Sequence, residues 1–177
     1  MFLSLASILL AAAPALSAPT TPYRYYLKSS TDLFLSSSMT FNGNTNYVLL
    51  TEKRLAQPLS LHDSDGSITL DTSNVIGASS EAPVLLSNDK GLSDTYKLVV
   101  LGDQKSENYT KGFSIDDDSG ALSLDKEGFG GFVACTAAKG VKQVYWYSEG
   151  EDSGSVPVIC DDVSFQRQWN LNGTGSG

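Results

Sequence analysis

Histidine and cysteine, which supply many nucleophilic and metal-binding sites, are nearly missing from this chain. Its 177 residues include one histidine, His62, and two cysteines. A Ser-His-Asp site needs a histidine to accept the hydroxyl proton, so His62 would have to serve. His62 lies in a sequence pattern whose second copy has Asp116 instead, which is typical of a solvated loop residue. We therefore predict no catalytic triad, no metal site and no cofactor.

Positive charge is also scarce. The chain has 12 lysines and arginines against 20 aspartates and glutamates, and its formal net charge is -8. The basic residues are scattered singly apart from the pair Lys53 and Arg54, so nucleic acid is not an expected partner. With 41% hydrophobic and 18% charged residues, the chain is too apolar for a disordered protein, and its size suits one domain.

Long apolar runs are confined to the amino terminus. Residues 2–16 carry no charged side chain and lead into small residues, which is typical of a secretory signal peptide. The alternative, an uncleaved membrane anchor, needs about 18 or more apolar residues. We predict a signal peptide over 1–18, a single domain over 19–169 and a flexible polar tail over 170–177. The product is expected to be secreted, with no membrane contact after the signal is removed.

Two further features agree with export. Cys135 and Cys160 are an even pair, and in an exported chain such a pair is expected to form a disulfide. Closing this loop should stabilise the fold by about 3 kcal/mol. A pair of metal thiolates is the alternative, but the sequence offers no further cysteine. Asn108 and Asn172 begin two glycosylation sequons.

Apolar and polar residues alternate with a period of two along most of the chain, which predicts β-strands. Clusters of Gly, Asn, Asp and Ser separate the strands and favour turns. No window has a helical stripe, although residues 52–57 suit one helical turn. The predicted strands cover residues 23–27, 33–35, 47–51, 59–61, 68–70, 83–86, 96–101, 113–115, 121–124, 132–136, 143–147 and 163–165.

An internal repeat organises these strands. Residues 59–71 align without a gap on residues 113–125, and a looser, shorter version covers 25–35. Each of the two longer copies predicts a hairpin with its apolar residues on one face and a glycine, Gly66 or Gly120, at a turn that requires positive φ. Repeating hairpins favour an all-β fold, a β-trefoil-like closed barrel, with a two-sheet antiparallel β-sandwich as the alternative.

Four segments carry a resemblance to a known group of proteins: residues 23–28, 32–36, 128–135 and 143–147. They resemble an uncharacterised family of small secreted proteins of filamentous fungi. A fainter similarity is to the carboxyl-terminal region of fungal cell-wall mannoproteins, from which this chain departs in having only two cysteines and no processing repeats. The resemblance implies a location at the fungal exterior and little about chemistry.

Acidic residues provide the remaining catalytic hypothesis. A glycoside hydrolase needs two carboxylates about 5 to 9.5 Å apart across a cleft. Residues 116–120 also resemble a fragment of a calcium loop, but the downstream glutamate is missing. We interpret these acids as turn residues. The candidates for an acid pair are Asp116, Asp117, Asp118, Glu149, Glu151, Asp152, Asp161 and Asp162.

Aromatic residues in one strand suggest a binding surface. In residues 144–147, alternation places Tyr145 and Tyr147 on one face and Val144 and Trp146 on the other. We expect one face to be wet, where aromatic rings stack on sugars. The alternative is that these rings fill the core. Trp169, after the last predicted strand, is expected to close the end of the barrel.

The sequence therefore favours a non-enzymatic extracellular binding protein, effector-like or carbohydrate-binding. Its ligand residues would be Tyr145 and Tyr147, and its partner an extracellular glycan or a host protein. A passive component of the cell wall or extracellular matrix is one alternative. A glycoside hydrolase that uses paired acids is the other.

Overall fold

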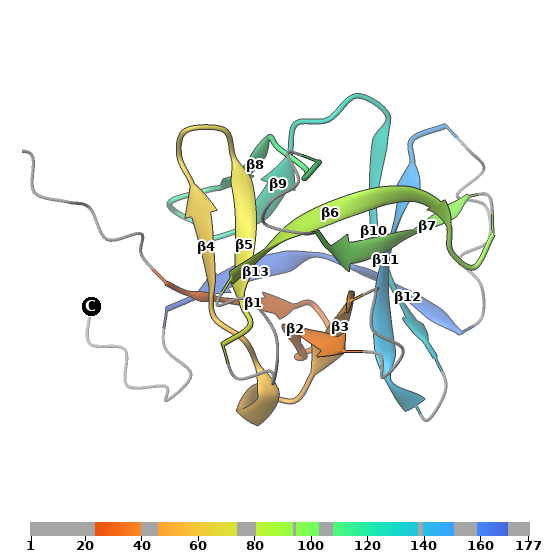
Figure 1. Ribbon diagram of the computed structural model, residues 1–177, viewed down its shortest axis with the longest axis horizontal. Helices are drawn as coiled ribbons and strands as arrows, with labels where there is room; N and C mark the ends of the chain where they lie inside the picture. Colours follow the sequence, from red (N-terminus) through yellow and green to blue (C-terminus); the bar gives the residue numbers. More distant parts are fainter. Residues whose placement is uncertain are drawn as a thin grey trace, which may run out of the picture.

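The computed structural model describes residues 24–39, 46–73, 81–93, 95–102, 108–137, 140–150 and 159–169. In these residues the chain forms strands β1 to β13 and one short 3-10 turn, so the all-β prediction is confirmed (Figure 1). The described part contains no helix with the length and hydrophobicity needed to cross a membrane. The predicted signal peptide, the polar tail and Asn172 lie outside the described residues.

The strands are short and follow the alternating segments of the sequence. Every predicted strand overlaps an observed one, and the expected helical turn is the 3-10 turn η1 (Lys53–Leu55). The amino-terminal strands are β1 (Tyr26–Ser29), β2 (Phe34–Met39), β3 (Asn46–Thr51), β4 (Leu59–His62), β5 (Ser67–Asp71), β6 (Glu81–Lys90) and β7 (Tyr96–Leu101). The others are β8 (Phe113–Ile115), β9 (Leu122–Leu124), β10 (Phe129–Thr136), β11 (Lys142–Ser148), β12 (Cys160–Val163) and β13 (Phe165–Gln168).

Eleven of these strands form one antiparallel sheet that curls into a half-barrel. Its order is β13-β1-β2-β3-β11-β7-β6-β5-β4, and β10 joins it by pairing with both β11 and β12. Tyr25, just before β1, forms an isolated bridge with Leu59 of β4. The described strands thus show a curled half-barrel, and they show neither the predicted β-trefoil-like closed barrel nor the alternative two-sheet antiparallel β-sandwich.

Apolar side chains on the two faces of the sheet form two clusters. The main core is inside the curl and includes Leu27, Val48, Leu59, Leu70 and Val144, all nearly inaccessible to solvent. The second cluster lies at the end of the molecule that carries the disulfide. It consists of Tyr96, Val133, Cys135, Tyr145 and Cys160, with Leu98 and Tyr147 packed against them.

Strand β11 contributes to both clusters. Val144 and Trp146 belong to the main core, whereas Tyr145 and Tyr147 contact the second cluster, so the predicted alternation is confirmed. The indole N–H of Trp146 donates a hydrogen bond to the Ser87 carbonyl at 2.9 Å. The expectation of a wet face is wrong for Tyr145, which is only 6% exposed, because neighbouring side chains of the same sheet and the turn at Gly91 pack against it.

The two long copies of the sequence repeat are hairpins with the same register. Gly66 and Gly120 have φ values of 66° and 71°, as the turns require. The first hairpin pairs Leu59 with Leu70 and Leu61 with Ile68; the second pairs Phe113 with Leu124 and Ile115 with Leu122. The predicted hairpins are confirmed. The first is part of the large sheet, whereas the second is a separate two-stranded sheet attached to β13 by the bridge Ala121–Gln166.

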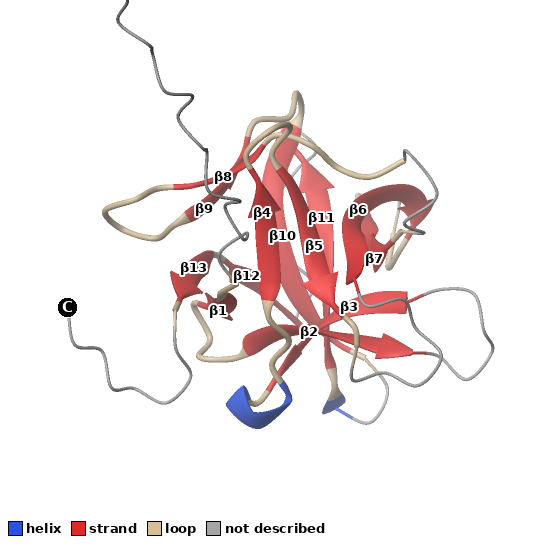
Figure 2. Cartoon of the chain, turned by 60° about the vertical axis from the view of Figure 1, so that its left-hand side comes forward, coloured by secondary structure: helices blue, strands red, loops and turns tan. Residues whose placement is uncertain are grey.

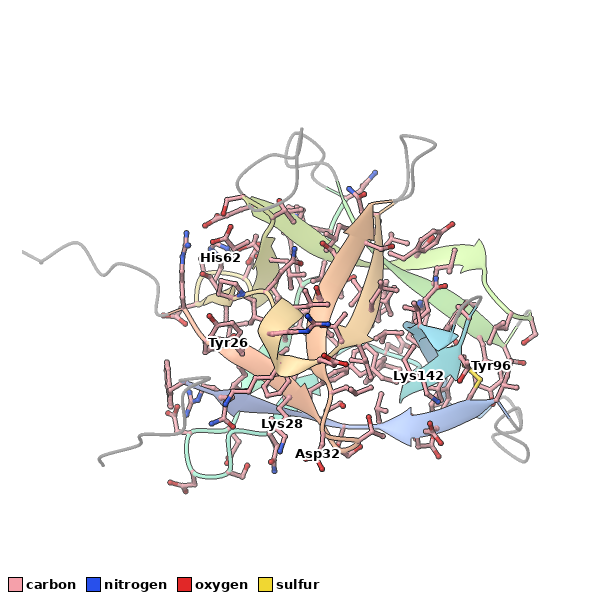
Figure 3. The ribbon with its side chains drawn as sticks, turned by 90° about the horizontal axis from the view of Figure 1, so that it is seen from below. Tyr26, Lys28, Asp32, His62, Tyr96 and Lys142 are labelled. Carbon is pink, nitrogen blue, oxygen red and sulfur yellow. A yellow bond between two sulfur atoms is a disulfide. The ribbon has the colours of Figure 1, made fainter. Side chains whose placement is uncertain are left out.

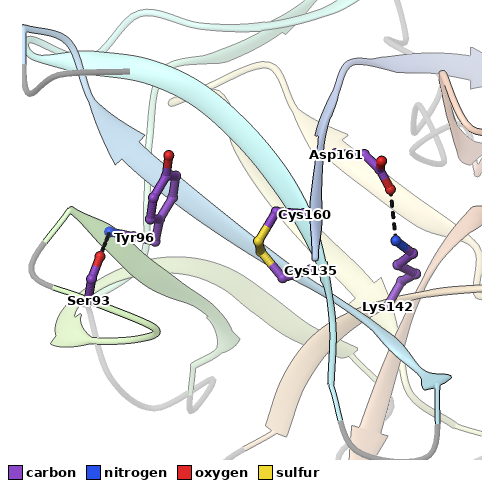
Figure 4. Close-up of a disulfide and its surroundings, with 6 residues drawn as sticks. All are labelled: Ser93, Tyr96, Cys135, Lys142, Cys160 and Asp161. Carbon is purple, nitrogen blue, oxygen red and sulfur yellow. Dashed lines mark hydrogen bonds and ion pairs between the residues drawn. A yellow bond between two sulfur atoms is a disulfide. The ribbon is translucent and has the colours of Figure 1, made fainter. Parts of the chain in front are cut away.

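The predicted disulfide between Cys135 and Cys160 is confirmed (Figure 4). The two cysteines are opposite each other in the register of β10 and β12. Strand β12 pairs with β10 alone, so the disulfide holds an edge strand to the sheet. Beside it, the Lys142 ammonium lies 2.7 Å from the Asp161 carboxylate and links β12 to β11.

Candidate functional site

The two repeated hairpins lie next to each other in space. The Gly112 N–H donates to the Asp65 carbonyl (3.1 Å) and the Phe113 N–H to the Gly66 carbonyl (2.8 Å). A Cβ atom at Gly66 would lie 2.7 Å from the Phe113 carbonyl oxygen, so this close approach requires glycine. Figures 1 and 2 show the β8–β9 hairpin beside β4, and in Figure 2 it stands out from the body of the sheet.

A cavity of about 1320 Å³ lies at this junction, and we call it the hairpin groove. Residues 61–66 of the first hairpin line it, together with residues 112–115, 117 and 125 of the second. Tyr25, Arg167 and Trp169 complete the lining. Leu61 and Ile115, and likewise Asp63 and Asp117, are equivalent positions of the repeat, so the two copies contribute corresponding side chains to one groove.

Tyr25 is the most unusual residue of the groove. Two backbone hydrogen bonds with Leu59 fix its position, and the side chain is only 4% exposed. Its hydroxyl is buried, and it has no hydrogen-bond partner in the part of the chain that the structure describes. Burial raises the pKa of this hydroxyl above its usual value, with a smaller lowering by Arg167 and a raising by Asp63. A buried hydroxyl without a partner costs about 1–3 kcal/mol.

Trp169 supplies an accessible aromatic surface beside Tyr25. The Arg167 guanidinium lies 4.4 Å from the centre of its ring, and the Tyr25 ring meets it edge-on at 5.8 Å. Trp169 is 53% exposed, so the expectation that it closes the end of a barrel is wrong. It follows the last strand at the mouth of the groove, where the sheet provides no further layer to cover it.

Two of the four carboxylates in the groove have cationic partners. Asp117 lies 3.5 Å from Arg167, and Asp65 lies 3.6 Å from Lys111. Asp65 also accepts hydrogen bonds from the Tyr109 hydroxyl (3.2 Å) and from the Ser67 N–H (3.0 Å). The bonds from Ser67 are the main cause of its lowered pKa.

The other two carboxylates, Asp63 and Asp125, are exposed. Neither side chain has a hydrogen bond or an ion pair within the described ranges of the chain. His62, interpreted above as a loop residue, is instead the half-buried last residue of β4, and its Nε2 lies 3.1 Å from the Thr69 hydroxyl. The groove therefore has an excess of negative charge.

The predicted ligand residues Tyr145 and Tyr147 do not line the groove. Tyr145 is buried in the second cluster, and burial raises its pKa. The half-buried ring of Tyr147 meets Tyr96 edge-on at 6.2 Å and covers Gly130, where a Cβ atom would lie 2.6 Å from it. Both side chains thus have packing contacts that explain their position, and a ligand role for them stays a prediction.

Of the acid candidates, Asp116 has turn contacts, whereas Asp161 and Asp162, interpreted above as turn residues, lie in strand β12. The Asp116 carboxylate accepts hydrogen bonds from the Ser119 N–H and hydroxyl, which lower its pKa. Among the residues that the structure covers, no group of three or more His, Cys, Asp or Glu side chains is arranged to hold a metal ion. Asn108 is exposed, as a glycosylation acceptor must be, whereas residues 151–152 lie outside the described part.

Sequence reasoning identified both hairpins but not the groove between them. A repeat predicts that two segments fold alike, and it does not predict that they pack together. One signal was available: Arg167 and Trp169 are two residues apart, and the period of a strand places such residues on the same face.

No curated protein and no solved structure matches the chain. One family model does match, over residues 18–169, and its description is domain of unknown function (DUF7907). This match covers most of the chain, including all of the described strands. The expectation of an uncharacterised domain is thereby confirmed, while the fungal source and the likeness to mannoproteins stay predictions. The chain belongs to the DUF7907 family.

Proposed function

We propose that this protein is a secreted, non-enzymatic binding protein that holds a carbohydrate in the hairpin groove. The observation that carries the proposal is the buried hydroxyl of Tyr25, which has no partner among the described residues, beside the exposed ring of Trp169. The apolar face of a sugar ring would stack on Trp169, and a sugar hydroxyl would satisfy Tyr25 once a small opening of the groove lets it reach this buried atom.

The rest of the groove suits this ligand. Leu61, Phe113 and Ile115 provide apolar surface, and carboxylates provide acceptors for sugar hydroxyls. Binding pockets are typically apolar with a few polar groups that fix the orientation of the ligand. Sugars are more polar than most small ligands, and the aspartates of the two hairpin turns supply the additional polar contacts.

The proposal also includes a location outside the cell and a non-enzymatic role. The buried disulfide supports an oxidising environment outside the cell, and the resemblance to small secreted fungal proteins supports the fungal exterior. The net charge of -8 argues against nucleic acid as a partner. The single histidine, bound to Thr69, supports binding without acid–base chemistry by imidazole.

A glycan array on the oxidised protein tests this function. We expect retention on a limited set of glycans, a loss of at least tenfold in affinity for Trp169→Ala, and a smaller loss for Tyr25→Phe. Tyr147→Phe is the matched control, because it removes a tyrosine hydroxyl outside the groove, and it should bind as the wild type does.

Three outcomes would overturn the proposal. Retention on no glycan would leave a passive wall or matrix component as the better hypothesis. If Tyr147→Phe abolished binding and Trp169→Ala did not, the binding site would lie on β11 and not in the hairpin groove. Cleavage of a retained glycan would replace binding by glycoside hydrolysis.

A further inference from the structure

The charges of the hairpin groove are not balanced by the protein. Asp65 and Asp117 have cationic partners, but Asp63 and Asp125 have no ion pair in the described residues. These two carboxylates are therefore available to interact with a ligand in the groove. A ligand with negative charge would be repelled, and a ligand with positive charge would be attracted more strongly than a neutral one.

The unbalanced charge is next to the buried hydroxyl that lacks a partner. Tyr25, Asp63 and Arg167 all line the groove. A ligand in the groove therefore shares it with Tyr25 and with Asp63. It must combine a hydroxyl for Tyr25, a flat apolar face for Trp169 and positive charge for the carboxylates.

The size of the groove argues for more than one unit of such a ligand. Its volume of about 1320 Å³ exceeds the roughly 300–1,000 Å³ that is usual for one small ligand. A second cavity of about 230 Å³ shares His62, Ser64 and Asp65 with it and extends to Tyr109. Several linked units would fit this space better than one.

We infer that the preferred ligand is an oligomer of amino sugars with free, protonated amines, such as linked glucosamine units, held by Asp63 and Asp125. This inference rests on the proposed function, because it names the class of carbohydrate that the same groove takes. Each ammonium would donate a charge-assisted hydrogen bond to a carboxylate, about twice as strong as a neutral one. Acetylation of the amines removes this contact and keeps the sugar ring.

Two glucosamine oligomers of equal length, one with free amines and one fully N-acetylated, test the inference by titration calorimetry on the full oxidised chain. The free-amine oligomer should bind at least tenfold more tightly at low salt, and this advantage should shrink as salt screens the carboxylates. The double variant Asp63→Asn with Asp125→Asn should lose the advantage and still bind the N-acetylated oligomer. Asp118→Asn, in the turn but outside the groove lining, is the matched control and should keep the advantage.

The outcomes separate this inference from the function on which it rests. Equal affinity for both oligomers would overturn the inference and leave carbohydrate binding in place. Binding of neither oligomer, with other glycans retained on the array, would also overturn it, and binding of no glycan would overturn both. An oligolysine peptide that binds as tightly as the free-amine oligomer, and loses affinity in the same double variant, would assign a basic peptide instead.

Discussion

Aromatic side chains at the disulfide end of the molecule pack against one another and against a covalent link, whereas those at the groove end line an open cavity. Figure 3 shows the two ends well apart, with His62 of the groove on one side and Tyr96 of the second cluster on the other. Tyr145 is almost fully buried, but Trp169 is more than half exposed.

The polar atoms of the aromatic residues show what this difference means. The indole N–H of Trp146, deep in the main core, has the Ser87 carbonyl as its partner, and such pairing is the rule for buried polar groups. Tyr25 breaks this rule at the groove. Departures from packing rules are expected at functional sites, where the free protein is less stable than it could be. The comparison thus supports the proposal that one end contributes stability and the other binds a ligand.

The largest expected effect comes from removing an aromatic ring at the disulfide end, and it tests the proposed difference between the two ends. Tyr145→Ala should lower the free energy of unfolding by about 3–5 kcal/mol, because it leaves a large cavity in the second cluster. Trp169→Ala should lower it by only about 1 kcal/mol, because the ring is more than half exposed and its contacts include an edge contact with Tyr25 and a cation–π contact with Arg167. Urea denaturation of both variants measures the difference.

Glycan affinity is the control for this pair. Folded Tyr145→Ala protein should bind as the wild type does, whereas Trp169→Ala should not. Equal destabilisation by the two variants would show that Trp169 is a structural residue, and the proposed division between the ends would be wrong.

Removal of the disulfide should have the next largest effect. Replacement of Cys135 and Cys160 by alanine should reduce the free energy of unfolding by about 3 kcal/mol, because it releases a loop of 25 residues and frees the edge strand β12. Thermal unfolding followed by circular dichroism measures this loss. The groove is built from other strands, so glycan affinity at a temperature where the variant is folded should stay unchanged, and a parallel loss of affinity would contradict the separation of the two ends.

The sequence predicted local structure well, because local structure depends on period and turn chemistry. Gly66 and Gly120 identified both hairpin turns, and the apolar residues around them identified the register. Alternation likewise predicted which residues of β11 share a face. These features depend on neighbours in the chain, and the sequence displays those neighbours directly.

Burial could not be predicted in the same way. Tyr145 is buried because side chains of the neighbouring strand β10 and the turn at Gly91 pack against it, and only the folded sheet shows this. Trp169 is exposed for the opposite reason, since it is the last described residue and none of the described strands covers its ring. The half-barrel could not be predicted for a related cause: a repeat of hairpins does not specify how far a sheet curls or whether it closes.

The smallest expected effect concerns Tyr25 itself and depends on pH. Tyr25→Phe keeps the ring and removes the hydroxyl that has no partner among the described residues, so at pH 7 the variant should be as stable as the wild type or about 1 kcal/mol more stable. Burial raises the pKa of Tyr25 in the folded state, so the wild type binds this proton more tightly when folded. The contribution of this bound proton to the free energy of unfolding is complete below the ordinary tyrosine pKa of about 10. It is lost as the pH rises from that value toward the raised pKa of the folded state.

Phenylalanine has no such proton, so the variant should lose less stability than the wild type between pH 7 and about pH 11. Urea denaturation at both pH values measures the two losses, and the pH 7 comparison controls for any change in packing. Equal losses would mean that the hydroxyl is accessible to water in the free protein, and Tyr25 would then no longer distinguish the groove from the disulfide end. A smaller loss in the variant, together with weaker glycan binding, would show that the same hydroxyl limits stability and serves the ligand.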